Sequence, residues 1–181
     1  NNSTNAMDPH EFKNFFCLLI AAGNDTTRYS IAMSLYQLSL NNNLIKDLKS
    51  NRYWETCADE FIRLASPTMY FRRTATCDVN LRDKIIKKGD KVILWFVSGN
   101  RDKEVFQDPH NVLLSRSPNP HVSFGQGGVH FCLGIWLARM EVRILLEEII
   151  KKINMIEPLK DPTWTRSNFI CGVKSLLVRI N

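Results

Sequence analysis

The sequence predicts a mainly helical fold with a small β component, and three features lead to this prediction. Residues 9–40 carry apolar side chains at helical spacing over a length that suits one long helix. Residues 71–96 change to short β-branched runs separated by a turn around Gly89. Residues 135–153 return to a helical pattern before a strand-like run at 172–180. Helices therefore account for most of the expected domain, and the strands for small sheets.

The bulk composition is that of one globular domain. The 181 residues are enough to bury a sizeable core, and 44% are hydrophobic against 23% charged. Lys and Arg number 24 and Asp and Glu 18, so the formal charge is +6. Because these charges are dispersed along the chain, we expect no nucleic-acid partner, whereas an acidic protein partner would fit.

The cysteines and the apolar runs point to a cellular compartment. The five cysteines are odd in number, and no two have a metal-type CxxC spacing. The first residues, 1–10, are polar and unlike a leader peptide. We therefore expect a reducing, cytoplasmic compartment. No apolar run of about 18 residues occurs, so no membrane segment is expected within this chain.

The first expected helix has a conventional start and an unusual middle. Asp8 suits the cap position and Pro9 the first turn. At residues 21–27, small and polar side chains interrupt an otherwise apolar helix. Such residues are poor interior helix formers, and a local rule broken in mid-helix points to function. The apolar side chains that we expect in the core are Phe12, Phe15, Phe16, Leu19, Ile20, Ile31, Leu35 and Leu38.

Shorter elements follow this helix. Residues 41–43 break it, a short helix reaches about Leu48, and another spans about 56–65. A long loop at 98–120 contains three prolines, and a loop of that length is usually functional. The expected strands are 71–79, 84–86, 92–96 and 172–180. In the helix at 135–153, we expect one apolar face made of Leu137, Met140, Ile144, Leu145 and Ile149, with Arg139, Arg143, Glu147 and Glu148 outside.

A glycine-rich stretch surrounds Cys132. Gly125, Gly127 and Gly128 allow tight turns and a close approach of the backbone to a flat ligand. Cys132 stands just before the last helix, whose N-terminus offers unpaired N–H groups and a positive dipole end that stabilise a thiolate. An iron centre would deprotonate the thiol in any case, and a thiolate ligand favours O–O cleavage.

Three other interpretations compete with an iron ligand. A lone cysteine in a glycine-rich turn is more often a buried free thiol. A zinc site would need more ligands than His130 and Cys132, which stand two apart without another cysteine pair. A phosphate-binding loop would need a preceding strand and a Lys-Ser/Thr ending, which this stretch lacks.

The stretch resembles the cysteine loop of the cytochrome P-450 family, in which Phe, Gly, a basic residue, Cys and Gly recur in this order. Phe124 precedes Cys132 by eight residues, one more than the commonest spacing. The extra glycine is similar to bacterial members that hydroxylate sterol side chains or methyl-branched lipids. The resemblance implies haem b, with Cys132 as the axial ligand of its iron. It also implies cofactor contacts for Phe124, Gly125, Gly127, His130 and Gly134.

Two further segments resemble marks of this family. Glu60 and Arg63 form a Glu-x-x-Arg, which in the family is a buried structural lock and not a catalyst. As an isolated pattern it is an ordinary surface pair. Arg73 matches the position that binds a haem propionate through its guanidinium fork, and strand alternation separates it from Arg72. His130 resembles the second propionate contact; for both, the competing interpretation is a solvent-facing charge.

The middle of the first helix resembles the oxygen-activating groove of the family. The resemblance implies that Ala22 and Gly23 leave room for dioxygen above the iron. It also makes Asp25 and Thr26 the catalytic pair, because an acid beside a hydroxyl can relay protons. The competing interpretation is a capping-type irregularity in a kinked helix. Because Cys132 is on the same chain, we prefer the groove.

By the same resemblance, the substrate pocket would be lined by Thr68, Met69, Phe71 and Ile170, for which plain core packing is a nearly equal alternative. The resemblance covers nearly all 181 residues, as the C-terminal part of a single P-450 domain. Complete members are much longer, so we expect the N-terminal half of the fold to be absent. The exposed apolar surface that results predicts self-association.

The implied activity is the insertion of one oxygen atom into an apolar substrate of the sterol, fatty acid or terpenoid class. Electrons would come from NAD(P)H through a reductase and a ferredoxin-type donor. One alternative is a truncated, non-catalytic chain with weak haem binding or none. Another is a haem-binding sensor or carrier, which has no need of the proton relay at Asp25 and Thr26.

Overall fold

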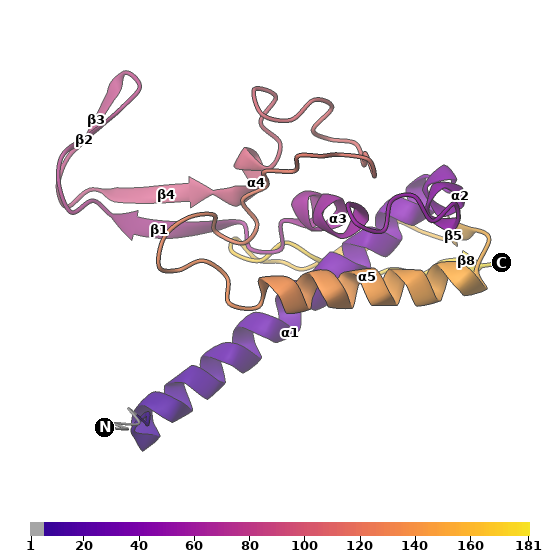
Figure 1. The fold of residues 1–181 in the computed structure, drawn as a ribbon, viewed down its shortest axis with the longest axis horizontal. Coiled ribbons are helices and arrows are strands. Elements are labelled where there is room, and N and C mark those ends of the chain that lie inside the picture. Colours follow the sequence, from indigo (N-terminus) through magenta and orange to yellow (C-terminus); the bar gives the residue numbers. More distant parts are fainter. Residues whose placement is uncertain (1–5) are drawn as a thin grey trace.

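A computed structural model describes residues 6–181 of the protein. Within them, a long helix crosses the molecule, two further helices pack against its C-terminal half, and small two-stranded sheets lie beside this helical body (Figure 1). The helices are α1 (Pro9–Leu40), α2 (Asn43–Lys49), α3 (Cys57–Ala65), α4 (Phe96–Gly99) and α5 (Ile135–Lys152). The strands are β1 (Tyr70–Thr74), β2 (Val79–Leu81), β3 (Lys84–Ile86), β4 (Lys91–Trp95), β5 (Ile156–Pro158), β6 (Thr163–Trp164), β7 (Val173–Ser175) and β8 (Val178–Ile180).

The start of α1 confirms the predicted cap. The Asp8 carboxylate accepts hydrogen bonds from the backbone N–H groups of His10 and Glu11, at 2.7 and 2.9 Å. The Glu11 side chain in turn accepts from the Asp8 backbone N–H at 3.2 Å. This reciprocal arrangement is a capping box, with Pro9 in the first turn, and it satisfies donors that the helix leaves unpaired.

The exposure of α1 changes near its middle. Its C-terminal half is packed, and Leu38 is completely buried. The N-terminal half extends beyond the other described elements (Figure 1), so the expected burial of its apolar side chains is wrong. Phe12 and Ile20, for example, are 60% and 56% exposed. The apolar spacing specified a helical face correctly, but no part of the described chain lies against it.

The core forms where α1, α2, α3 and α5 meet. Helix α3 contacts both α1 and α5, which brings three helices around one apolar cluster. The cluster contains Leu38, Leu44, Ile45, Leu48, Cys57, Ala58, Phe61, Ile62, Leu114, Val142, Leu146, Ile150, Ile153 and Ile156.

Helix α5 presents a different face to the core than the sequence predicted. Leu137, Met140 and Ile144 are 54%, 52% and 50% exposed, while the expected Leu145 and Ile149 are half-buried. The buried stripe consists of Ile135, Val142, Leu146 and Ile150. Because α5 carries apolar residues around most of its circumference, periodicity alone cannot choose between two stripes. The contacts with α1 and α3 select the second one.

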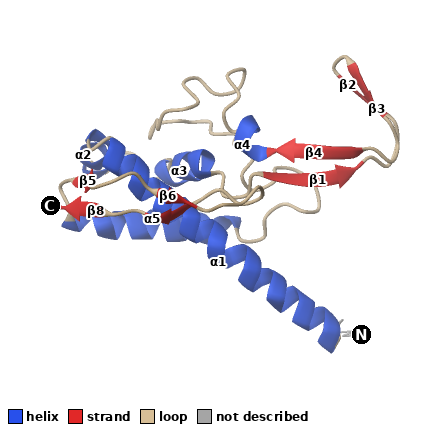
Figure 2. Ribbon diagram, turned by 180° about the vertical axis from the view of Figure 1, so that it is seen from behind, coloured by secondary structure: helices blue, strands red, loops and turns tan. Residues whose placement is uncertain are grey.

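The strands form four separate antiparallel pairs, β1–β4, β2–β3, β5–β8 and β6–β7 (Figure 2). The predicted strand at 71–79 therefore ends at Thr74, and the one at 172–180 divides into β7 and β8, which pair with different partners. The sequence analysis did not predict α4, β5 or β6. These elements have two to four residues, which is too short to show a period.

A close approach between Tyr29 and Gly172 fixes the C-terminal segment against α1. A Cβ added at Gly172 would lie 2.1 Å from the Tyr29 ring, so only glycine fits under that ring. The Tyr29 hydroxyl also accepts a hydrogen bond from Thr165 at 3.1 Å. Through these contacts the buried half of α1 holds the segment that carries β6 and β7.

Candidate functional site

The cysteine loop folds back on itself just before α5. Gly125, Gly127 and Gly128 adopt φ angles of 67°, 81° and 89°, a left-handed conformation that suits glycine. The loop is closed by a 3.0 Å hydrogen bond from the backbone N–H of Cys132 to the backbone carbonyl of Phe124. The predicted tight turns are therefore present, and they place Cys132 opposite the residue that opens the loop.

Cys132 lies two residues before the cap of α5, which is Gly134. No side chain caps this helix, so its first N–H groups and its positive dipole end are directed at the loop without a carboxylate or hydroxyl between them. The thiol of Cys132 is half-buried and forms no disulfide. The thiolate is the form of cysteine that binds a metal.

The other cysteines are less suited to this role. Burial raises the pKa of Cys57 to about 12, against a smaller opposing effect of Arg143. Burial also raises the pKa of Cys171, where the nearby Arg101 opposes it. Cys17 and Cys77 are exposed and lie outside the glycine loop. Cys132 is therefore the cysteine whose surroundings fit a metal thiolate.

Exposed apolar side chains lie near Cys132 in the sequence. Val129 and Leu133 are 96% and 77% exposed, and Trp136 is 76% exposed in the first turn of α5. A flat, largely apolar group could cover these side chains while its metal meets the Cys132 sulfur. A single thiolate in an apolar frame fits a haem iron. Among residues 6–181, no three His, Cys, Asp or Glu side chains gather into a group that could hold a metal ion by themselves.

The two expected propionate contacts are both exposed. Arg73 lies on β1, where its guanidinium donates to the carbonyl of Arg72 at 3.0 Å and lies 5.8 Å from the Phe71 ring. Within the described residues, neither Arg73 nor His130 is paired with a carboxylate. Both side chains are thus available to a carboxylate that the chain itself does not supply.

The residues of the expected oxygen groove lie in α1, which is one continuous helix over Pro9–Leu40. The Thr26 hydroxyl donates to the carbonyl of Ala22 at 2.6 Å. A Cβ added at Gly23 would meet no atom within 4 Å, so the space beside it is open. Asp25 is ion-paired to Arg28 at 2.6 Å, and within the described chain its carboxylate makes no hydrogen bond with Thr26. The structure brings Thr26 and Ala22 together but does not join Asp25 to them.

Glu60 and Arg63 form the buried lock and not a surface pair. Both side chains are completely buried, and Arg63 donates to both carboxylate oxygens of Glu60, at 2.8 and 2.9 Å. Arg63 also donates to the backbone carbonyls of Asn100, Pro109 and Asn111. The pair therefore ties α3 to the long loop that precedes the cysteine, which is the structural role that the resemblance implied.

A third charged residue, Arg116, completes this network. Its Nε donates to Glu60 at 2.9 Å, and the Glu60 carboxylate also accepts from the Leu113 backbone N–H at 2.8 Å and the Asn119 amide at 3.1 Å. Sequence reasoning missed Arg116 because it lies in an irregular loop, where no periodicity marks a residue as buried. Its position among three prolines in a long loop was the only signal.

Asp59, beside Glu60 on α3, anchors a second cluster that the sequence analysis also missed. His121 Nε2 is 3.0 Å from its carboxylate, and Arg139 Nε donates to the same oxygen at 2.7 Å. Burial acts to raise the pKa of Asp59, but the hydrogen bonds from His121 and Arg139 outweigh it and hold the pKa below its ordinary value. For Glu60, burial is likewise outweighed by Arg63, the Leu113 N–H and Arg116, so its pKa is lowered too.

These two lowered pKa values predict a loss of stability in acid. A group whose pKa is lower in the folded state stabilises the fold above its ordinary pKa, here 3.8 for Asp59 and 4.5 for Glu60. That contribution disappears as the pH falls through the folded value. We expect the free energy of unfolding, measured by urea denaturation, to fall below about pH 4.5 and to fall less steeply in Asp59→Asn. A control variant, Glu141→Gln, which removes an exposed carboxylate of α5 outside both networks, should keep the wild-type slope; equal slopes in all three proteins would contradict the prediction.

The four predicted pocket residues gather where β1 begins. Thr68 and Ile170 form an isolated antiparallel bridge, and Met69 donates its backbone N–H to Phe169 at 2.9 Å. The Phe71 ring packs edge-on against Phe169, with ring centroids 5.7 Å apart. The structure therefore brings together the two distant segments that carry these residues, 68–71 and 169–170.

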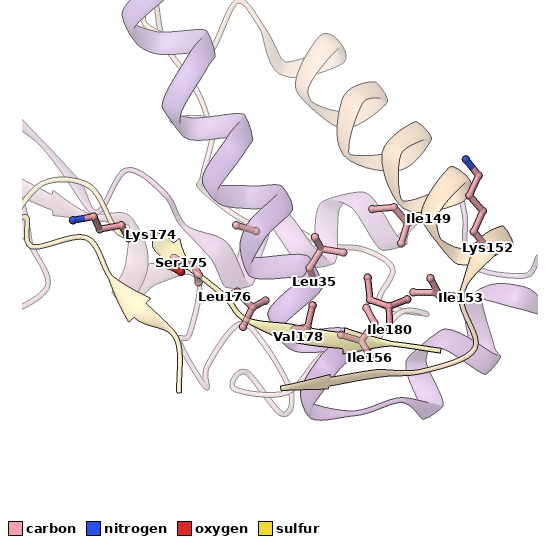
Figure 3. Close-up of a pocket in the computed structure, with 12 residues that line it drawn as sticks. Leu35, Ile149, Lys152, Ile153, Ile156, Lys174, Ser175, Leu176, Val178 and Ile180 are labelled. Carbon is pink, nitrogen blue, oxygen red and sulfur yellow. The ribbon is translucent and has the colours of Figure 1, made fainter. Parts of the chain in front are cut away.

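A separate apolar cavity of about 320 Å³ lies near the C-terminal ends of α1 and α5 (Figure 3). It is bordered by the C-terminal parts of α1 and α5 and by β8, with Lys152 and Lys174 at its edge. None of the predicted site residues lines it. Its apolar lining includes Leu35, Ile149, Ile153, Ile156, Val178 and Ile180.

No helix in the described range has the length and the apolar content needed to cross a membrane.

Comparison with known proteins identifies the family. The sequence model of cytochrome P450 matches residues 1–177. A methyl-branched lipid omega-hydroxylase of Mycobacterium tuberculosis is 40% identical over 179 residues, which cover 95% of this chain and 41% of the relative. A steroid C26-monooxygenase of Mycolicibacterium smegmatis is 41% identical over 168 residues, or 93% of this chain and 39% of that protein.

Solved structures agree with the sequence relatives. A cytochrome P450 of Mycobacterium marinum in complex with pseudoionone has a TM-score of 0.91 and 38% identity, covering 97% of this chain and 43% of that one. A Bacillus megaterium enzyme, CYP109E1, in complex with corticosterone has a TM-score of 0.90 and 34% identity, covering 99% of this chain and 49% of that one. The chain spans about two fifths of the length of its curated relatives and has a partial cytochrome P450 fold. The chain belongs to the cytochrome P450 family.

Proposed function

We propose that the protein carrying this chain is a haem-thiolate monooxygenase that inserts one atom of dioxygen into an apolar substrate. The observation that carries the proposal is Cys132, a half-buried thiol at an uncapped helix N-terminus inside an apolar frame. When bound, haem supplies the iron at which dioxygen is reduced and activated. The protein residues would hold it, exclude water and deliver protons.

Each site residue has a proposed task. Cys132 would bind the iron, while Arg73 and His130 would bind the two propionates, because both side chains lack a carboxylate partner in the described chain. Thr26 would hold a proton at its hydroxyl oxygen, with the open space at Gly23 beside it for dioxygen. The loop glycines Gly125, Gly127 and Gly134, with Phe124 and Ala22, would lie against the cofactor.

Substrate and partners are proposed from the relatives. Methyl-branched lipid and steroid hydroxylases are the activities named for two of them, which supports an apolar substrate of the sterol, fatty acid or terpenoid class. Thr68, Met69, Phe71 and Ile170 would line its pocket, since they gather beside β1. We propose that electrons come from NAD(P)H through a reductase and a ferredoxin-type donor, in the cytoplasm.

A spectrum of the reduced protein with carbon monoxide tests this proposal. We expect a long-wavelength Soret band from thiolate ligation, and we expect Cys132→Ala to abolish that band because no other cysteine lies in the loop. Cys17→Ser, which removes an exposed cysteine on α1, is the matched control and should keep the band. A band that survives Cys132→Ala would overturn the ligand assignment.

The alternative of a non-catalytic chain has one supporting observation. Apolar side chains along α1 and α5 are exposed, including Phe16, Leu19, Trp136 and Leu137 at 54%, 45%, 76% and 54%. A chain with this much uncovered apolar surface is expected to self-associate, and a haem site open to water binds its cofactor weakly. The same spectrum separates the two functions, because a non-catalytic chain gives no thiolate band after incubation with haem.

A further inference from the structure

The Phe124 side chain, at the start of the cysteine loop, lies near the imidazole ring of His121 and the guanidinium group of Arg139. The His121 ring centroid lies 5.5 Å from the Phe124 ring centroid, with an interplanar angle of 50°. The Arg139 guanidinium carbon lies 5.4 Å from the same ring centroid. A cation or a polar ring at this distance interacts favourably with the aromatic face. Phe124 is thus fixed from α5 on one side and from the preceding loop on the other.

Asp59 holds both of these groups in place. The same carboxylate oxygen accepts from Arg139 Nε at 2.7 Å and lies 3.0 Å from His121 Nε2. The His121 side chain is 2% exposed, and its Nδ1 is buried without a hydrogen-bond partner in the described chain. Among residues 6–181, Asp59 is therefore the only polar anchor of this imidazole.

Phe124 in turn touches the cysteine through the backbone. Its carbonyl accepts the backbone N–H of Cys132 at 3.0 Å. Arg139 also lies 5.2 Å from the ring of Trp136, which belongs to the first turn of α5. One guanidinium therefore contacts an aromatic side chain on each side of Cys132 in the sequence, Phe124 before it and Trp136 after it.

From these contacts we propose that Asp59 is a positioning residue for the Cys132 thiolate. It acts through His121, Arg139 and Phe124 to fix the backbone bond that sets the orientation of the cysteine. The inference rests on the proposed function, because it assigns Asp59 a task at the haem ligand. It is separate from the Glu60 lock, since Asp59 faces His121 and Arg139 whereas Glu60 faces Arg63 and Arg116.

The direct test is hydrogen exchange at the Cys132 amide, followed by NMR in the protein without haem. In Asp59→Asn the carboxamide keeps the shape of the side chain but loses the charge that binds Arg139. We expect the exchange of the Cys132 amide to accelerate at least about tenfold, while amides in the middle of α5 exchange at their wild-type rates. Arg139→Gln should give the same local effect.

Arg143→Gln is the matched control. Arg143 lies one turn further along α5 and is ion-paired to Glu55 and Glu147 at 2.8 Å each, but it does not contact Phe124. This variant should leave the Cys132 amide unchanged. The positioning role is overturned if the Cys132 amide exchanges at the same rate in Asp59→Asn as in Arg143→Gln. It is also overturned if Asp59→Asn accelerates exchange throughout α5.

A second measurement uses the haem-loaded protein. We expect Asp59→Asn to shift the reduction potential of the iron and to reduce the thiolate band with carbon monoxide, whereas Arg143→Gln changes neither. If wild-type protein shows no thiolate band, the proposed function fails. The exchange experiment still decides separately whether Asp59 positions Cys132, because it needs no haem.

Discussion

Replacing Glu60 with Ala is expected to lower the free energy of unfolding by about 3–5 kcal/mol, because it leaves two arginines without their counter-ion. Arg63 is completely buried and Arg116 almost so, and both donate to the Glu60 carboxylate. A buried guanidinium that loses its carboxylate retains the cost of desolvation without the compensating attraction. Urea denaturation of the two proteins at neutral pH measures the difference.

Glu55→Ala is the control for this prediction. Glu55 is ion-paired to Arg143 at 2.8 Å, but its side chain is 85% exposed, so removing it should change the free energy of unfolding by less than about 1 kcal/mol. If Glu60→Ala and Glu55→Ala lower the free energy of unfolding by similar amounts, burial of the Glu60 network does not add to stability. A larger loss in Glu60→Ala should also accelerate proteolysis in the loop at 100–120, since Arg63 and Arg116 hold that loop through backbone carbonyls.

Local patterns predicted much of this fold. The capping box at Asp8, the end of α3 before Pro67 and the glycine conformations around Gly127 all depend on neighbouring residues, and all are present. Glycine and proline restrict the backbone at their own positions, so their effect can be recognised without knowing the tertiary structure.

Interactions between distant segments were not predictable in the same way. Arg116 and His121 are buried because α3 lies against their loop, and nothing within a few residues of either one signals it. The buried face of α5 was predicted wrongly for a related reason. Whether Val142 or Ile144 is buried depends on which side of α5 packs against the neighbouring helices. Long-range contacts therefore decided burial wherever the local pattern allowed two answers.

The hydroxyl of Thr26 is one of a regular series along α1 that the sequence analysis did not recognise. Ser30 donates to the carbonyl of Thr26 at 2.9 Å, and Ser34 donates to the carbonyl of Ser30 at 2.8 Å. Ser30 and Ser34 are buried, where a backbone carbonyl is the acceptor within reach. Thr26 is half-buried and the most accessible member of the series, so its hydroxyl can exchange Ala22 for water or a ligand.

Thr26→Val is therefore expected to reduce the rate of substrate oxidation by about 10²-fold or more in the haem-loaded enzyme, the usual loss when a proton-transfer group is removed. Valine keeps the shape of threonine but has no hydroxyl to hold a proton. The thiolate band with carbon monoxide should stay intact, because Thr26 and Cys132 lie on different elements. Oxidation of NAD(P)H should continue with little product, so the ratio of product to NAD(P)H consumed is the quantity to measure.

Three further variants help to interpret that ratio. Thr26→Ser restores a hydroxyl at the same position and should recover most of the product, while Thr27→Val, at a buried neighbour, should leave the ratio near wild type. Asp25→Asn tests the acid that the structure pairs with Arg28 and not with Thr26. If Asp25→Asn also lowers the ratio, the ion pair must open for Asp25 to supply protons. An unchanged ratio would mean that Thr26 takes its proton from solvent, because its hydroxyl lies on the exposed side of α1.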